Sequence, residues 1–356
     1  MNLSIRIAVF FALPTVLVPT CALAESILGQ LPTSPERIVS TVPSNDDGNP
    51  YGVAFVPGGF PSDGLLAPGD ILVSNFNDSG GVQGTGTTIV SIAPGAQAVT
   101  FFQGPTGLGL STALGVLRAG FVLVGNVPTA NYGSAAEQGS LLVIDRYGNL
   151  VHKLASAAFL DGPWDLTVND QGSIAQVFVS NVLNGTVTRL DVSLANGDFQ
   201  IYGVNQIGHG YSWAPNSAAV VVGPTGLAYN PAADLLYVAS TDDNKIFAIP
   251  SAKSTTMDVM RGLLVYSDST HLHGPVGLAL APNGHLIASN GDAVFAGGSP
   301  NELVEFTQTG EFVAQYQVDP GAPGAAFGLA FSYDPVNPRF ATVDDNQNTL
   351  DIWNLH

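Results

Sequence analysis

Residues Pro224–Tyr229 read Pro-Thr-Gly-Leu-Ala-Tyr, and this phrase decides the fold because it returns along the chain. The pattern is a proline, one further residue, a glycine and a short apolar run. Other copies begin at Pro50, Pro105, Pro163 and Pro275, and a sixth copy, which lacks the proline, begins at Ala326. The copies follow one another at intervals of 51 to 61 residues, and an internal period of this length predicts a repeat architecture.

Each copy of the phrase continues into three more strand-like runs. In the fourth copy these runs are 236–241, 245–249 and 263–266, rich in β-branched and aromatic residues and bounded by turn formers. Four short antiparallel strands at a period of about 50 residues are typical of a propeller blade. The sequence therefore predicts an all-β fold, a six-bladed β-propeller with four antiparallel strands per blade. The blades are expected to begin near residues 50, 105, 163, 224, 275 and 326.

The two ends of the chain are expected to share the last blade. The sixth copy ends after its third strand, 349–354, because the chain stops at His356. Residues 37–42 form a strand-like run before the first blade and have no other partner. Pairing this run with the C-terminal strand would close the ring and remove its open edges. We therefore expect an N-terminal segment over 25–48, with a closing strand near 37–42, followed by the propeller over 49–356.

The first 24 residues have the pattern of a secretory signal peptide. Arg6 supplies a positive charge, an apolar run follows at 7–18, and Ala22-Leu-Ala24 is a small-residue cleavage site. Cleavage near Ala24 would remove Cys21, the single cysteine, and leave a chain without disulfides or thiol chemistry. A lipid anchor at Cys21 is the alternative, but Val18-Pro19-Thr20 is a poor lipobox. We expect an exported protein, periplasmic or extracellular, without a transmembrane anchor.

Composition excludes several classes of partner. The chain has 10 Lys and Arg residues against 28 Asp and Glu residues, which gives a net charge of −18. This balance provides no basic surface for nucleic acid and would repel an anionic membrane. Hydrophobic residues make up 46% of the chain and charged residues 11%, the opposite of a disordered composition. A monomer is expected, since a closed propeller leaves few open strand edges.

Polar side chains end the second strand of every expected blade. One such residue per blade would bring six of them near the propeller axis; they are Asn75, Asn126, Asn181, Asp242, Asn290 and Asp344. Amide and carboxylate oxygens suit Ca²⁺, which takes six to eight oxygen ligands. The alternative is structural, because Asn and Asp also end strands by forming local turns. The ring is therefore either an axial cation site or a set of turn residues.

The loops after the second and fourth strands should meet at one face of the propeller, which we call the top face. They carry a group of aromatic and histidine side chains that are candidate ligand-binding residues, namely Trp164, His209, Tyr211, Trp213, His271 and His273. Aromatic rings there could stack on a sugar or an apolar molecule. The three histidines could instead hold Zn²⁺, and His273 or Asp161 could move a proton as a catalytic residue. The structural alternative is that these side chains pack the loops against the rest of the protein.

The repeat phrase and its spacing resemble those of NHL-repeat or TolB-like six-bladed β-propellers, over residues 36–356. That superfamily contains lactone hydrolases of the gluconolactonase and regucalcin kind, virginiamycin B lyase and propellers that only bind, so the likeness alone gives no activity. A gluconolactonase-like site would imply a central divalent cation that polarises a lactone carbonyl, with Asn126, Asn181 and Asp242 among its ligands. The glutamate of that family stands at the opening of the first blade, where this chain reads Asn49-Pro50-Tyr51.

Two functions follow from these observations. The first is an exported binding module whose top face presents its loops to a small molecule, a glycan or a protein. The alternative is a metal-assisted lactone hydrolase or lyase with an axial divalent cation, for which Ca²⁺ is the candidate. The sequence favours the binding module, because no set of catalytic residues stands out and the family's glutamate is missing. Whether the protein is an enzyme stays open at this point.

Overall fold

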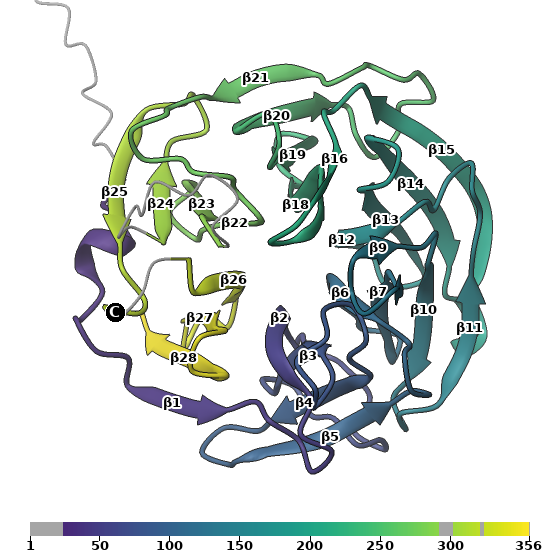
Figure 1. The fold of residues 1–356 in the computed structure, drawn as a ribbon. Helices are drawn as coiled ribbons and strands as arrows, with labels where there is room; N and C mark the ends of the chain where they lie inside the picture. The colour runs from purple at the N-terminus through teal and green to yellow at the C-terminus, as the bar shows by residue number, and fades with distance from the viewer. Residues whose placement is uncertain (1–23, 292–301, 321–323, 356) are drawn as a thin grey trace, which may run out of the picture.

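The computed structural model describes residues 24–291, 302–320 and 324–355. It confirms the propeller, because six four-stranded antiparallel sheets stand around one axis in sequence order (Figure 1). The predicted signal peptide lies outside the described residues, except for Ala24. Among the described residues, no helix is both long and apolar enough to cross a membrane.

The strands of each blade follow the chain from the axis outward. The inner strands are β2 (Gly48–Phe55), β6 (Leu110–Leu117), β12 (Pro163–Asp170), β18 (Pro224–Asn230), β22 (Gly277–Leu280) and β26 (Ala326–Ser332). Blade 1 continues with β3 (Ile71–Asn77), β4 (Thr88–Ile92) and β5 (Ala98–Gln103), and blade 2 with β7 (Phe121–Asn126), β10 (Ser140–Asp145) and β11 (Leu150–Leu154). Blade 3 continues with β13 (Ile174–Asn181), β14 (Thr186–Ser193) and β15 (Gln200–His209), and blade 4 with β19 (Leu235–Ser240), β20 (Lys245–Pro250) and β21 (Leu263–Tyr266). Blade 5 adds β23 (Leu286–Ser289), β24 (Leu303–Phe306) and β25 (Phe312–Tyr316), and blade 6 adds β27 (Arg339–Asp344) and β28 (Thr349–Asn354).

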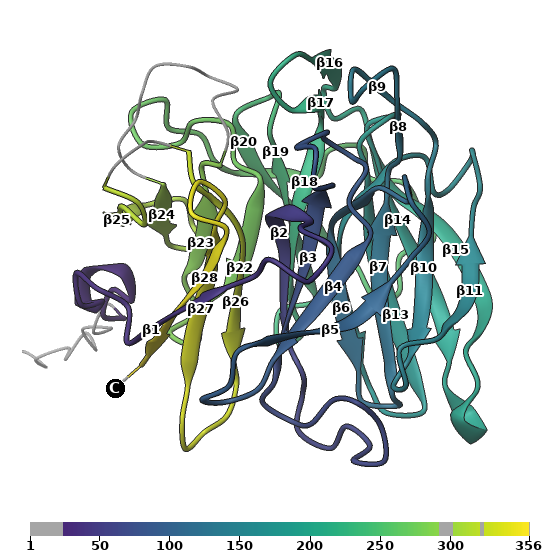
Figure 2. The ribbon, with the colours of Figure 1, turned by 60° about the horizontal axis from the view of Figure 1, so that its bottom comes forward.

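Several short elements lie outside the six blades. Two small hairpins stand at the top face; they are β8 (Thr129–Ala130) with β9 (Ala135–Ala136), and β16 (Ala214–Asn216) with β17 (Val220–Val222) (Figure 2). Two 3₁₀ turns, η1 (Leu28–Gln30) and η2 (Ala195–Gly197), lie outside the sheets.

The N-terminal strand closes the ring as expected. β1 (Arg37–Ser40) pairs antiparallel with β28, so that Arg37 stands opposite Ile352 and Ser40 opposite Thr349. It thereby becomes the outermost strand of blade 6 (Figure 1). The strand ends two residues earlier than expected, shortly before Pro43, which has no amide hydrogen to donate.

Blade 2 begins later than the repeat phrase indicates. Its inner strand starts at Leu110, whereas Pro105–Leu108 forms a turn in which the amide of Leu108 donates to the carbonyl of Pro105 at 3.1 Å. The reason is the backbone of two glycines: Gly107 and Gly109 both have φ near +73°, which lies outside the extended region. The phrase therefore marks the approach to this strand rather than the strand itself.

Glycine recurs in the phrase because neighbouring inner strands approach each other backbone to backbone. A Cβ atom on Gly226 would lie 2.6 Å from the amide nitrogen of Leu278, and one on Gly277 would lie 2.3 Å from the carbonyl oxygen of Phe327. Close packing of this kind leaves no room for a side chain. The third copy of the phrase is the exception, since it carries Asp165 at this position.

Hydroxyl groups tie each of blades 1 to 5 to the blade that follows it. They donate to the buried backbone of the neighbouring inner strand in the pairs Ser74–Ser111 (3.1 Å), Ser111–Pro163 (2.8 Å), Ser180–Thr225 (2.7 Å), Thr241–Pro275 (2.7 Å) and Ser289–Phe327 (2.5 Å). Buried carbonyl groups need such partners. The serine that precedes the strand-ending asparagine in blades 1, 3 and 5 therefore has a structural role between blades.

The residues before β1 are fixed on blade 5. The buried carboxylate of Glu305, in β24, accepts hydrogen bonds from Ser26 Oγ at 2.7 Å, Ile27 N at 3.0 Å and Leu28 N at 2.8 Å. His285 Nδ1 lies 2.7 Å from the same carboxylate. The segment that would begin the mature chain is therefore part of the folded structure.

Candidate functional site

A cavity of about 670 Å³ runs along the propeller axis. All six inner strands line it, and at one level each contributes a single apolar side chain: Val53, Leu114, Leu166, Leu227, Leu278 and Leu329. The lining continues to Ser332, at the end of β26, and to residues 56–58 and 333–335, which belong to the loops that join the first and second strands of blades 1 and 6. Those loops lie at the lower edge of Figure 2, so the cavity opens at the face opposite the top face.

Asp165 brings a carboxyl group into this apolar lining. Its two oxygens accept hydrogen bonds from the backbone amides of Leu166 at 2.7 Å and of Leu227, in blade 4, at 3.1 Å. Among the described residues it has no ion-pair partner, and burial raises the pKa of its carboxyl group well above the ordinary value. Asp165 is therefore an acid that the surroundings favour in its protonated form.

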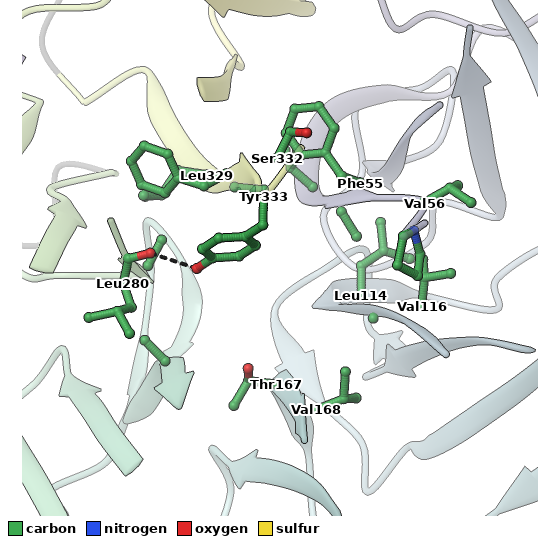
Figure 3. A pocket seen from close by; sticks show the side chains of 18 of the residues that line it. Phe55, Val56, Leu114, Val116, Thr167, Val168, Leu280, Leu329, Ser332 and Tyr333 are labelled. Carbon is green, nitrogen blue, oxygen red and sulfur yellow. Dashed lines mark hydrogen bonds between the residues drawn. The ribbon is translucent and has the colours of Figure 1, made fainter. Parts of the chain in front are cut away.

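A tyrosine crosses the mouth of the cavity. Tyr333, just after β26, reaches toward blade 5 and donates its hydroxyl hydrogen to the carbonyl oxygen of Leu280 at 2.8 Å (Figure 3). Its side chain is 70% exposed. Ser332 and Thr167 add hydroxyl groups to the lining shown in Figure 3. The lining therefore includes hydroxyl groups beside its apolar side chains.

The top end of the axis is closed by four aromatic side chains, which we call the aromatic plug: Tyr51, Phe76, Trp164 and Phe327. The ring centres of Tyr51 and Phe327 are 4.3 Å apart, and those of Phe76 and Trp164 are 5.7 Å apart. None of the four is more than 4% exposed. A hollow of only about 50 Å³ remains beside the plug at this face. This hollow is much smaller than the axial cavity.

The predicted ring of Asn and Asp residues contacts the protein's own backbone and hydroxyls. The amide nitrogens of Asn75, Asn126 and Asn181 donate to the carbonyl oxygens of Thr41 (3.1 Å), Leu108 (2.6 Å) and Phe159 (3.1 Å) in the segments that enter each blade. Asn290 donates to His271 O at 2.6 Å, and Asp344 accepts from Gln347 N at 3.1 Å. These contacts tie the strand ends to the segments that enter the blades, and only the contact of Asp344 is a local turn.

Asp242 does not occupy the same place as the other ring residues. In blade 4 it is Ser240 that stands opposite the first proline, Pro224, just as Asn181 stands opposite Pro163 in blade 3. Asp242 lies two residues beyond the strand end. Within the described ranges, no three His, Cys, Asp or Glu side chains are grouped so that they could hold a metal ion. Cation binding by the ring stays a prediction.

The aromatic candidates of the top face differ in exposure. Trp164 is 1% exposed within the plug, and Tyr211 is 2% exposed, with its hydroxyl donating to Arg261 O at 3.1 Å. Trp213 is 45% exposed. Two of the three rings therefore pack the fold, and only Trp213 could meet a ligand at the surface.

The histidine candidates are held by separate partners. His209 Nδ1 lies 2.7 Å from Asp258, and His271 Nδ1 lies 2.6 Å from Asp268. His273 Nε2 contacts the carbonyl oxygen of Thr270 at 3.2 Å. His209 ends the outer strand of blade 3 whereas the other two precede blade 5, and the described residues contain no cluster that joins them. Asp161, in the turn before β12, has its pKa raised by burial.

Comparison with known proteins places the fold. No protein-family profile and no curated protein matches the chain. Among solved structures, a gluconolactonase from Xanthomonas campestris is 13% identical, with a TM-score of 0.55, over 90% of this chain and 96% of its own. Regucalcin, a calcium-binding protein from Agrobacterium tumefaciens, is 13% identical, with a TM-score of 0.52, over 89% and 93%. A protein described as an oxidoreductase (glucose dehydrogenase) from Thermus thermophilus is 12% identical, with a TM-score of 0.52, over 89% and 99%.

The chain shares the six-bladed propeller fold of these neighbours. Their different names illustrate that one propeller architecture carries different chemistries. The shared fold therefore does not determine the chemistry of this chain.

Proposed function

We propose that this protein is exported and that it binds and hydrolyses a small, mostly apolar lactone or ester in its axial cavity. One observation carries the proposal: Asp165, an acid with no ion-pair partner among the described residues, lines a mostly apolar cavity of about 670 Å³. A concave apolar cavity with a few polar groups is the usual form of a small-molecule site. Ionisable groups with strongly shifted pKa values gather at functional sites.

The proposed chemistry uses the proton of Asp165. Because burial raises the pKa of this carboxyl group, it can donate a hydrogen bond to the carbonyl oxygen of a bound lactone or ester. A water oxygen then forms a bond to the polarised carbonyl carbon, and the bond from that carbon to the ring or alkoxy oxygen breaks. The departing oxygen takes the proton that the water releases. The product is a hydroxy acid, or an acid and an alcohol, and Asp165 ends the cycle in its starting state.

The fold it shares with a gluconolactonase supports a hydrolase more than a module that only binds. The shared fold also supports the metal-assisted alternative, for which Ca²⁺ is the ion to test. Asn75 and Asn181 each have one buried amide oxygen without a protein partner, whereas the amide oxygen of Asn126 accepts from Ser140. Two neutral oxygens fall short of the six to eight that Ca²⁺ takes. The described ring residues therefore do not fit the ion by themselves, and the step above uses no metal.

The test is hydrolysis of a panel of apolar lactones and esters by the chain that begins at Glu25. Asp165→Asn should lower kcat/KM by at least about a hundredfold, because an amide is a weaker hydrogen-bond donor to developing negative charge. Asp161→Asn tests the other acid that the sequence offers as a catalytic residue; Asp161 precedes β12 and is not among the residues that line the axial cavity, so the proposal predicts an unchanged rate. Equal rates for Asp165→Asn and the unmodified chain would contradict the proposal.

The same assay separates the other candidates. Loss of activity in EDTA with recovery in Ca²⁺ would favour the metal-assisted hydrolase or lyase. A ligand that raises Tm without turnover by the unmodified chain would favour an exported binding module. For that second candidate the specific support is Trp213, which is 45% exposed at the top face. Trp213→Ala should then abolish the Tm shift, and Asp165→Asn should not.

A further inference from the structure

The lining of the axial cavity contains acidic residues but no basic ones. The described lining has Asp165 along its inner strands and Asp334 at its mouth, and it includes no lysine, arginine or histidine. Arg339 reaches the rim, but its guanidinium donates to Gly69 O at 2.8 Å and lies 5.1 Å from the centre of the Phe55 ring. The whole chain carries a net charge of −18. A negatively charged molecule therefore meets no lysine, arginine or histidine among the residues of this lining.

This lining should bind neutral and anionic ligands with different affinities. Moving a carboxylate from water into an apolar site costs several kcal/mol unless a cation or several hydrogen-bond donors receive it. An uncharged carbonyl group costs much less and can accept a hydrogen bond from Asp165. We infer that the axial cavity selects its ligands by charge, so that it admits uncharged apolar carbonyl compounds and excludes carboxylates. This inference rests on the proposed function and names its substrate class.

Selection by charge has a consequence for turnover. Hydrolysis of a lactone or ester turns an uncharged carbonyl compound into a carboxylate inside the cavity. That product has no cationic partner in the described lining, so it leaves for water more readily than the substrate does. Inhibition by added product should therefore be weak at neutral pH and should grow as the pH approaches the pKa of the free acid.

The test uses three probes with one carbon skeleton: decanamide, decanoate and decylamine. Their binding to the chain that begins at Glu25 is measured by calorimetry at neutral pH. Decanamide should bind at least roughly tenfold more tightly than decanoate, and decylamine should bind no more tightly than decanamide. Equal binding of decanoate would overturn the inference. Tightest binding of decylamine would also overturn it, because Asp165 would then act as a carboxylate that receives a cation.

A gain-of-function variant tests the reason for the exclusion. Thr167 lines the cavity, with its side chain drawn in Figure 3. Thr167→Lys should tighten decanoate binding at least roughly tenfold relative to the size-matched control Thr167→Met, because it supplies the missing cation. No gain in a folded Thr167→Lys chain would overturn the inference. If that variant does not fold, decanoate binding to the unmodified chain decides, since its affinity must rise as the pH falls toward the pKa of the fatty acid.

The failure of this inference and the failure of the proposed function look different. If the protein hydrolyses lactones but binds decanoate and decanamide equally, the inferred charge selection is wrong and the proposed hydrolase activity stands. If the protein binds decanamide more tightly than decanoate but hydrolyses no lactone or ester, the charge selection stands and the proposed hydrolase activity is wrong.

Discussion

The carboxyl group of Asp165 accepts a hydrogen bond from the backbone amide of Leu227, at 3.1 Å, across the seam between blades 3 and 4. Four other blades meet their neighbours at this point through glycine, with no room for a side chain. The seam between blades 3 and 4 therefore accommodates a group that the repeat does not require. An acid placed in this way, beside an apolar cavity, is the feature that most separates this propeller from a purely structural repeat.

Asp165→Gly restores the repeat and should leave a folded chain. The change frees the amide of Leu227 from its partner, so we expect the free energy of unfolding to fall by about 1–2 kcal/mol in urea denaturation. Decanamide binding should weaken at least roughly tenfold, because the hydrogen-bond donor is gone. A folded Asp165→Gly chain that binds decanamide as tightly as before would contradict the role assigned to this residue.

Tyr333→Ala should open the cavity mouth. Since the Tyr333 side chain is 70% exposed, its removal should change the free energy of unfolding by no more than about 0.5 kcal/mol. The association and dissociation rates of decanamide should both rise, as stopped-flow measurements would detect. Tyr333→Phe keeps the ring, loses the hydrogen bond to Leu280 and should give intermediate rates. Unchanged rates in Tyr333→Ala would mean that ligands do not pass this residue.

Gly277→Ala should strain the seam between blades 5 and 6. The added Cβ would stand 2.3 Å from the carbonyl oxygen of Phe327, so the inner strands must separate. We expect a loss of about 1–3 kcal/mol in the free energy of unfolding. Gly58→Ala is the control, because a Cβ there would meet no atom within 4 Å. Equal midpoints for the two variants in urea would argue against backbone-to-backbone packing as the reason for the recurring glycine.

Glu305→Gln should loosen the N-terminal segment. The carboxylate receives Ser26 Oγ and the amides of Ile27 and Leu28, and an amide can accept only part of this set. A buried group with several charge-assisted bonds is worth about 2–4 kcal/mol in the free energy of unfolding. Ser26→Ala removes one bond and should cost about 1 kcal/mol. Protection of the amides of residues 27 and 28 from hydrogen exchange should fall in both variants, and unchanged protection would exclude this anchoring.

Stability should decrease as the pH rises through the neutral range. Burial raises the pKa of Glu302 to about 7 and that of Asp351 to about 6. A raised pKa means that the folded chain holds these protons more tightly than the unfolded chain, so the stabilisation is present at low pH and is lost as the pH passes about 6 to 7. The glutamine side chain in Glu302→Gln cannot ionise in the folded or the unfolded chain. The Tm difference between this variant and the unmodified chain should therefore shift in favour of the variant between about pH 5 and pH 8, and a constant difference would contradict the assignment.

The architecture could be predicted because it depends on repetition. A phrase that recurs six times, together with one unpaired strand at the N-terminus, leaves few arrangements other than a closed propeller. The start of blade 2 could not be placed from the phrase, because the glycines at 107 and 109 adopt positive φ and move the strand to Leu110. Local backbone geometry of this kind is not visible in a pattern of residue types.

The candidate site was harder to predict than the fold. The polar loops predict a site at the top face. The residues that follow the strand-ending asparagines, however, belong to one buried apolar cluster at this end; they are Phe76, Val127 and Val182. The axial cavity is lined by apolar inner strands that look like any other core. Its one sign in the sequence is Asp165, which stands where the other copies of the phrase have glycine.

The position of a bound neutral ligand shows directly whether the axial cavity is the binding site. A crystal grown with decanamide should show the molecule inside the axial cavity, with its carbonyl group at Asp165 and its chain directed toward Tyr333. Decanamide bound at the top face beside Trp213 or His271, with an empty axial cavity, would contradict the account.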